Sequence, residues 1–201
     1  MASNRKKWLI KNLKEQAFPP NIIRAFDKID RSLFVPKEYI AEAYENIPLP
    51  INYNQTISQP YTIAFMLTLL KLKDKQKILE VGSGSGYVLA LLSHLSSKGK
   101  IFGVERIKEL ADKSQKLLEK YKNVKVIHGD GSKGLKEEQP FDRILVSAAA
   151  SSIPQNLVRQ LKFSGIMVVP VNNSIIVLEK TSGENKITEY PGFVFVPLIS
   201  D

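Results

Sequence analysis

In the first 70 residues, stretches with apolar residues at helical spacing are interrupted by one polar, proline-containing segment. Apolar residues recur at helical spacing over Trp8–Gln16, and the pair Pro19-Pro20 ends that pattern. Similar stripes over Asn21–Ile29 and Ile63–Leu70 also predict helices. The run Glu45–Gln59 contains prolines and asparagines, which favour turns and disfavour a helix or a central strand. The pattern therefore predicts a helical region with one irregular segment.

After residue 71 the pattern changes to short apolar runs that alternate with longer amphipathic stretches. This rhythm is typical of a parallel sheet covered by helices on both faces. Near the carboxyl end, an Asn172-Asn173 turn between two apolar runs predicts an antiparallel hairpin at one edge, and residues 162–165 are expected to end the last helix. The predicted strands are Lys77–Val81, Ile101–Glu105, Val124–His128, Ile144–Ser147, Ile166–Val171, Ser174–Glu179 and Phe193–Val196, and the predicted helices are Tyr87–Leu95, Lys108–Tyr121 and Pro154–Leu161.

Length and composition fit one folded domain. A chain of 201 residues can bury one sizeable core, and 43% hydrophobic with 24% charged residues is the balance of a globular protein. We therefore expect a single α/β domain over residues 1–201. Residues 1–70 would form an N-terminal helical extension, and residues 71–201 would form a doubly wound, mostly parallel seven-stranded sheet with an antiparallel edge hairpin.

The net charge of +9 raises the question of an anionic partner such as nucleic acid. Its densest part lies near the amino terminus around Trp8, and a solvated helix face is the simpler interpretation, so we expect no specific nucleic-acid partner. The lack of cysteine excludes disulfides, thiolate metal sites and a cysteine nucleophile. Because neither a secretory leader nor a membrane-spanning run is apparent, we expect a cytoplasmic protein with no membrane partner.

Three glycines, Gly82, Gly84 and Gly86, follow the predicted strand Lys77–Val81 and precede a helix. Glycine lets the backbone turn tightly there and lets a ligand approach without a Cβ in the way. A dinucleotide-binding loop needs a small residue where Tyr87 stands, and a Walker phosphate loop needs a lysine after its last glycine. Both are therefore disfavoured, whereas a glycine turn without a ligand stays open.

The run ILEVGSGSGY at 78–87 resembles the first motif of S-adenosylmethionine-dependent methyltransferases. Glu105 ends the next predicted strand, where a carboxylate can accept hydrogen bonds from ribose hydroxyls. Asp130 ends the strand after that and is placed to accept from the exocyclic amine of adenine. Glu80 could lie beneath an amino acid moiety, whose ammonium group would partner a buried carboxylate. A solvated strand end for Glu105 and an Asx turn for Asp130 are the alternatives.

A second segment points to one family within these methyltransferases. The run NYNQTISQPY at 52–61 looks like the signature of protein-L-isoaspartate O-methyltransferases. Further similar stretches are SLFVP at 32–36, AYENIPLP at 43–50, GDGS at 129–132, PFDRILVSAAA at 140–150 and FVPLI at 195–199. The resemblance covers about residues 9–199. It implies a Rossmann-like methyltransferase sheet, with a substrate-binding loop in residues 1–70 and a cofactor-binding core in residues 71–201.

The same resemblance implies roles for individual residues. Ser58 would be the catalytic residue, with its hydroxyl near the substrate carboxylate, and Thr56 and Ile57 would shape the same substrate-binding wall. Some family members have Ala-Pro-His where this chain has Gln59-Pro60-Tyr61, so any polar function of that histidine would fall to Tyr61. The cofactor-binding residues would be Glu80, Gly82, Ser83 and Gly84 at the methionine part, Glu105 at the ribose, and Asp130 and Gly131 at the adenine. The peptide cleft would be lined by Ala148, Ala149, Ala150, Val196 and Pro197.

The implied reaction moves a methyl group from S-adenosyl-L-methionine to the α-carboxylate of L-isoaspartyl residues in damaged proteins and peptides, with S-adenosyl-L-homocysteine as product. The methyl ester would then close to a succinimide that hydrolyses partly to aspartate; D-aspartyl residues are a further candidate acceptor. The carboxylate is ionised at pH 7, so neither a strong base nor a metal is needed, nor is either histidine, His94 or His128. We expect a monomer. The alternatives are a nucleic-acid or small-molecule methyltransferase on the same fold and a non-catalytic cofactor-binding module.

Overall fold

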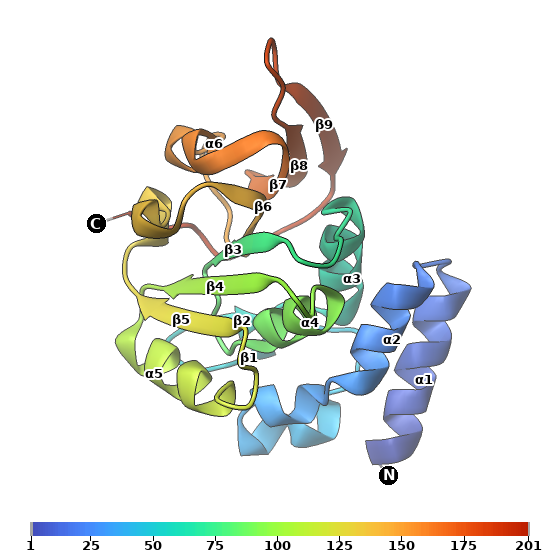
Figure 1. Cartoon of the computed structure of the whole chain (residues 1–201). Helices are drawn as coiled ribbons and strands as arrows, with labels where there is room; N and C mark the ends of the chain where they lie inside the picture. The colour runs from blue at the N-terminus through green and yellow to red at the C-terminus, as the bar shows by residue number, and fades with distance from the viewer. Residues whose placement is uncertain (1, 201) are drawn as a thin grey trace.

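A computed structural model describes residues 2–200, which are organised around one seven-stranded sheet (Figure 1). The strand order is β5-β4-β3-β6-β7-β8-β9. The first five strands in this order run parallel to one another, and β8 and β9 are antiparallel to their neighbours. The strands are β3 Lys77–Val81, β4 Lys100–Glu105, β5 Val124–His128, β6 Phe141–Val146, β7 Leu161–Val171, β8 Ser174–Glu179 and β9 Lys186–Pro191. The predicted mostly parallel sheet with an antiparallel edge is confirmed.

Helices cover both faces of this sheet, because alternate strand residues point to opposite sides. Ile78 of β3 packs in one apolar cluster with residues of α1 to α5, whereas its neighbour Leu79 packs in a second cluster with Leu157 of α6. Figure 1 accordingly shows α4 and α6 on opposite sides of the strands. The helices are α1 Ala2–Glu15, α2 Pro20–Lys28, α3 Pro60–Leu69, α4 Tyr87–Leu95, α5 Lys108–Leu117 and α6 Gln155–Gln160, with 3₁₀ turns η1 Arg31–Phe34, η2 Lys37–Glu42, η3 Gly131–Lys133 and η4 Lys136–Glu138.

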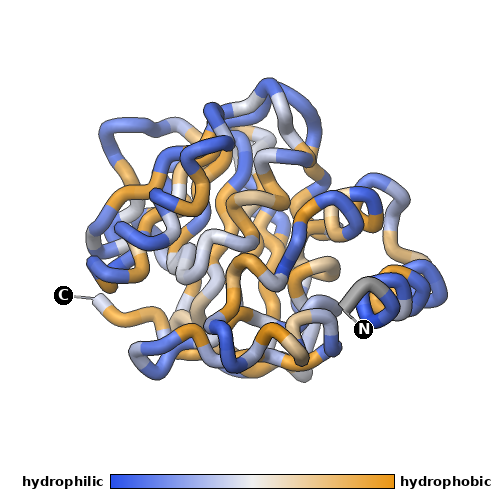
Figure 2. The backbone as a smooth tube through the Cα atoms, turned by 90° about the horizontal axis from the view of Figure 1, so that it is seen from below, coloured by the Kyte–Doolittle hydropathy of each residue, from blue (hydrophilic) through white to orange (hydrophobic). Residues whose placement is uncertain are grey.

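The apolar positions gather in the middle of the molecule, and polar positions lie around its rim (Figure 2). The first cluster extends from Leu9 in α1 to Val177 in β8, so the amino-terminal helices share their apolar contacts with the sheet. Within residues 2–200 no helix combines the length and the apolar character that a membrane crossing would require.

The irregular segment predicted over residues 45–59 is confirmed as lying outside the main sheet. It contains two short antiparallel strands, β1 Leu49–Pro50 and β2 Thr56–Ile57, which pair only with each other. We call this element the β1–β2 hairpin. Its tip, Asn52–Asn54, consists of three consecutive residues with positive φ. The prolines and asparagines that excluded a helix are therefore those that build a tight, isolated hairpin.

The prediction for the last strand was wrong. The strand lies at Lys186–Pro191 instead of Phe193–Val196, because Gly192, with a φ of 95°, turns the chain away from the sheet. As an edge strand that is mostly exposed, β9 lacks the apolar run that reveals a buried strand. Residues 162–165 also belong to strand β7, which begins at Leu161, and do not form the end of a helix.

Candidate active site

The glycine turn after β3 forms one wall of the candidate site. Gly82 and Gly84 have φ values of 76° and 51°, which side chains other than glycine rarely adopt. A Cβ placed on Gly84 would lie 3.1 Å from Cδ1 of Ile51, so the β1–β2 hairpin closely approaches the turn. The turn and the hairpin therefore face each other across a narrow gap at the carboxyl end of the central strands.

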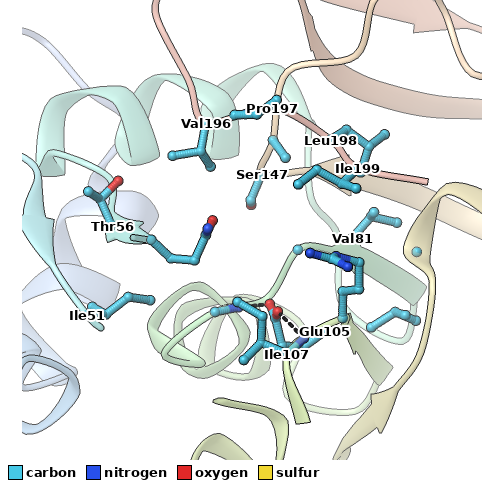
Figure 3. A pocket seen from close by; sticks show the side chains of 17 residues that line it. Ile51, Thr56, Val81, Glu105, Ile107, Ser147, Val196, Pro197, Leu198 and Ile199 are labelled. Atoms are coloured by element: carbon cyan, nitrogen blue, oxygen red, sulfur yellow. Dashed lines mark hydrogen bonds between the residues drawn. The ribbon is translucent and has the colours of Figure 1, made fainter. Parts of the chain in front are cut away.

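A cavity lies at this edge of the sheet, and we call it the sheet-edge cavity (Figure 3). In open α/β sheets, ligands bind in such a crevice outside the carboxyl ends of the strands. Its lining comes from the β1–β2 hairpin, from the strand ends and from the carboxyl-terminal segment: Ile51, Gln55, Thr56, Val81, Gly82, Gly84, Val104, Glu105, Arg106, Ile107, Gly131, Ser147, Ala148, Val196, Pro197, Leu198 and Ile199.

Two further cavities adjoin it. The outer cavity, with a volume of about 660 Å³, is lined by Pro48, Thr56, Ser58, Gln59, Tyr61, Thr62, Ser147 and residues 191–196. The inner cavity is lined by Thr56, Ile57, Ser58, Glu80, residues 82–85, Tyr87, Val88 and Ser147. Thr56 and Ser147 line all three cavities, and Ser58 lines the outer and the inner one. Ligands held in the sheet-edge and outer cavities would therefore meet beside these three hydroxyl-bearing residues.

Glu105 at the end of β4 has a buried and firmly held carboxylate. One oxygen accepts a hydrogen bond from the backbone N–H of Gly84 at 2.8 Å, and the other accepts from the N–H of Ile107 at 2.9 Å (Figure 3). A carboxylate has about four acceptor positions, so each oxygen keeps capacity for a ligand hydroxyl. This geometry suits the predicted role of Glu105 at a ribose and also ties the glycine turn to β4.

Glu80 in β3 is a buried acid with half of its carboxylate unsatisfied. Its Oε1 accepts a hydrogen bond from Oγ of Ser147 at 2.8 Å, whereas Oε2 and the nearby Oγ of Ser83 have no partner within the described residues. Burial, with a contribution from the charge of Glu105, raises the pKa of Glu80 to about 8, although the Ser147 hydrogen bond acts in the opposite direction. Unsatisfied buried polar atoms of this kind suit a ligand ammonium group.

Asp130 and Gly131 lie at the start of η3, and only Gly131 lines the sheet-edge cavity. The Asp130 carboxylate accepts from the N–H of Ser132 at 2.9 Å and pairs with Nζ of Lys133 at 3.1 Å. A Cβ on Gly131 would lie 2.5 Å from Cγ1 of Val81, which explains the glycine. The Asx turn weighed from the sequence is therefore present beside the cavity. Among residues 2–200 no three acidic or imidazole side chains converge as metal ligands do.

The predicted peptide-cleft residues divide into two groups. Ala148 and Pro197 line the sheet-edge cavity, and Val196 lines both that cavity and the outer one. Ala149 and Ala150 line none of the three cavities. Ala149 instead donates to the carbonyl of Val196 at 2.7 Å, which places the carboxyl-terminal segment along the site, and Ala150 donates to the carbonyl oxygen at residue 170.

Sequence reasoning did not assign Ser147 or Arg31. Ser147 follows β6, which lies beside β3, so its place at the end of a neighbouring strand is a signal that could have found it. Arg31 is fully buried and donates a hydrogen bond to the carbonyl oxygen of Ser58 at 3.0 Å. No sequence signal marks that contact, because arginine is normally an exposed residue.

A mostly parallel sheet with a glycine turn after its central strand, and acids at the ends of β3 and β4, defines the class as a Rossmann-like methyltransferase fold. The family model described as protein-L-isoaspartate(D-aspartate) O-methyltransferase matches residues 4–201. The chain belongs to this family.

Individual relatives agree with that membership. The protein-L-isoaspartate O-methyltransferase of Methanococcoides burtonii is 43% identical over 198 residues, which cover 95% of this chain and 98% of the relative. The enzyme of the same name from Fervidobacterium nodosum is 45% identical and covers 94% of this chain and 99% of its own. A crystal structure described as a β-aspartate methyltransferase from Plasmodium falciparum, in complex with S-adenosyl-L-homocysteine, superposes with a TM-score of 0.85 at 26% identity, covering 97% of this chain and 98% of that one.

Proposed function

We propose that this protein transfers a methyl group from S-adenosyl-L-methionine to the α-carboxylate of L-isoaspartyl residues in damaged proteins and peptides, as the names of its relatives suggest. The backbone nitrogen of the next residue then attacks the methyl ester and methanol leaves, which gives a succinimide that hydrolyses partly to aspartate. The observation that carries the proposal is the position of Ser58, which lines both the outer and the inner cavity where they adjoin the sheet-edge cavity. A donor and an acceptor held on either side would meet there.

The residues around the sheet-edge and inner cavities fit the cofactor. When bound, S-adenosyl-L-methionine supplies an electrophilic methyl group on a sulfonium centre. The unsatisfied oxygen of Glu80 would accept from its ammonium group, and Gly82, Ser83 and Gly84 would surround the methionine part. Glu105 would accept from the ribose hydroxyls. The adenine would lie along Gly131, with Asp130 behind that glycine in the η3 turn.

The acceptor needs orientation more than activation. An isoaspartyl α-carboxylate is ionised at pH 7, so it attacks the methyl group without a general base. Ser58 would donate its hydroxyl hydrogen bond to one carboxylate oxygen and aim the other oxygen, in line and about 3 Å from the reacting carbon. Because that bond also stabilises the ground state, its benefit lies in position. Thr56 and Ile57 would form the adjacent wall.

The outer cavity would accept the peptide around the isoaspartyl residue. Its volume of about 660 Å³ has room for several side chains, and both Tyr61 and Val196 lie on its wall. Residues 1–70 would share the acceptor side with residues 191–196, and the rest of residues 71–201 would supply the cofactor side of a single domain. The proposal includes action as a monomer in the cytoplasm, without a metal ion.

The test is transfer of labelled methyl from S-adenosyl-L-methionine to an L-isoaspartyl peptide, with the same peptide carrying normal L-aspartate as control. The expected result is base-labile label on the isoaspartyl peptide alone. Label on neither peptide, with cofactor binding retained, would refute the proposed acceptor and direct attention to nucleic acids, small molecules or a binding module without turnover.

A further inference from the structure

Arg31 is a buried charged side chain that the reaction described above does not use. It begins η1, is 0% exposed, and its guanidinium carbon lies 5.4 Å from the centre of the Tyr87 ring. Burial lowers the pKa of Arg31 to about 10, which leaves the group charged at pH 7. A full positive charge therefore lies buried against Tyr87, which belongs to the first apolar cluster.

The partners of this charge are neutral. Within residues 2–200 the guanidinium has hydrogen bonds to backbone carbonyl oxygens and no carboxylate partner, and its Nε has no hydrogen bond. In the neighbouring Asp30, Oδ1 accepts hydrogen bonds from Ser32 and from the hydroxyl of Tyr44. A buried charge without an ion pair destabilises a fold compared with an apolar side chain of similar size. Stability alone therefore does not explain why an arginine is placed here.

The two carbonyl acceptors explain its use. Nη1 donates to the carbonyl oxygen of Ser58 at 3.0 Å, and Nη2 lies 3.4 Å from the carbonyl oxygen of Ile47. Ile47 precedes the β1–β2 hairpin and Ser58 follows it. One rigid, planar group therefore bridges both legs at the base of the hairpin, a geometry that the single ammonium of lysine does not reproduce.

The β1–β2 hairpin needs such an external contact. It has two residue pairs, Leu49 with Ile57 and Pro50 with Thr56, and a tip whose three residues all have positive φ. An isolated two-stranded hairpin is at best marginally stable in water. Its position over the glycine turn therefore depends on side chains from elsewhere in the fold.

We propose that Arg31 is a positioning residue for methyl transfer, which clamps the base of the β1–β2 hairpin and so fixes Thr56 and Ser58 between the three cavities. The inference rests on the proposed function for its kinetic consequence only. The clamp sets where the Ser58 hydroxyl stands, whereas the carboxylates that would hold the cofactor belong to β3 and β4. Loss of the clamp should therefore slow the reaction more than it weakens cofactor binding.

The experiment compares Arg31→Lys and Arg31→Met with Arg143→Lys. Arg143 is a matched control, because it is also buried and donates to the carbonyl oxygens of Leu70 and Lys71 at 2.6 and 3.2 Å, at the end of α3 and away from the three cavities. For both Arg31 variants we expect kcat for the isoaspartyl peptide to fall about 10- to 100-fold, with a smaller loss for lysine than for methionine. The dissociation constant of S-adenosyl-L-homocysteine should change less than about threefold.

Amide hydrogen exchange gives a readout that needs no turnover. Exchange over residues 47–58 should accelerate in Arg31→Lys and stay as in the wild type in Arg143→Lys. Unchanged exchange there, an equal loss of kcat in the Arg143 control, or a globally unfolded Arg31→Lys protein would each overturn the proposal. If the wild type methylates no isoaspartyl peptide, the proposed function fails, and the exchange result still decides whether the clamp exists.

Discussion

The two walls of the site are built in different ways. On the sheet side, Glu80 and Glu105 lie at the ends of buried parallel strands, and Glu105 is fixed by two backbone N–H groups. On the hairpin side, Ser58 follows a strand of two residues and depends on Arg31 from a distant part of the sequence. The wall that would bind the methyl donor is thus held by the main sheet. The wall that would bind the methyl acceptor is held by side chains. Changes to the first wall should affect cofactor binding, and changes to the second should affect turnover.

The largest effect is expected from breaking the sheet side with Glu105→Ala. This change removes the acceptor for two backbone N–H groups as well as the proposed ribose partner. The two ribose hydroxyls would each lose a hydrogen bond to a charged group, which contributes about 1.5–3 kcal/mol. Affinity for S-adenosyl-L-homocysteine should therefore fall at least about 100-fold. Calorimetric titration checks this, with exposed Glu109→Ala as the control. Affinity within a few-fold of the wild type would mean that Glu105 does not face the cofactor.

The substitution Ser58→Ala removes the proposed catalytic hydroxyl on the hairpin side. Because the hydroxyl would orient the carboxylate, kcat should fall about 10- to 100-fold while the dissociation constant of S-adenosyl-L-homocysteine stays unchanged. Steady-state kinetics with the isoaspartyl peptide, beside exposed Ser97→Ala, measures the difference. A variant that loses cofactor affinity and keeps kcat would reverse the assignment of the two walls.

The proton on Glu80 links cofactor binding on the sheet side to pH. Its pKa of about 8 keeps it mostly protonated at pH 7 in the ligand-free protein, and a ligand ammonium group would lower that pKa. Binding should release a proton. Below pH 8, affinity for the cofactor should therefore rise with increasing pH, by up to about tenfold per pH unit. Titration in buffers of different ionisation enthalpy measures the release, which Glu80→Gln should abolish. Equal heats in both buffers would exclude the linkage.

The same group gives a stability prediction with a definite sign. Because the folded-state pKa of Glu80 lies above the ordinary value of 4.5, the folded protein binds more protons than the unfolded chain between about pH 4.5 and pH 8. The free energy of unfolding should therefore fall as the pH rises through that window, and by less in Glu80→Gln. Thermal unfolding of the two proteins at several pH values provides the test; parallel pH profiles would contradict it.

The smallest effect concerns long-range charge on the acceptor side. With a net charge of +9, the protein should attract acidic segments around an isoaspartyl residue. Raising the salt from about 20 mM to about 300 mM should increase KM for an acidic isoaspartyl peptide a few-fold and leave KM for a neutral one nearly constant. A KM for the acidic peptide that ignores salt would remove this role for the basic surface.

Much of the sheet side could be predicted from the sequence, because its signals are local. The strands Lys77–Val81 and Val124–His128 begin and end where the apolar runs do. Gly82 and Gly84 indicated a tight turn, and the structure gives both a positive φ. A buried parallel strand leaves a continuous apolar run in the sequence, and a glycine turn leaves its glycines.

The β1–β2 hairpin and the outermost strand β9 left weaker signals in the sequence. The edge strand β9 is mostly exposed and carries no apolar run, so Phe193–Val196 was mistaken for it. The two-residue strands β1 and β2 are too short for a periodic pattern, and Arg31 gave no sign of its burial.

The sequence by itself determined the fold class, the place of the glycine turn and the acids at the strand ends, because each depends on neighbours a few residues away. Only the tertiary structure decided that Ser147 joins Thr56 and Ser58 at one junction, and that Arg31 bridges Ile47 and Ser58. Those arrangements depend on contacts between residues far apart in the chain. Such contacts form only when burial of the shared core brings the elements together, and local patterning does not encode them.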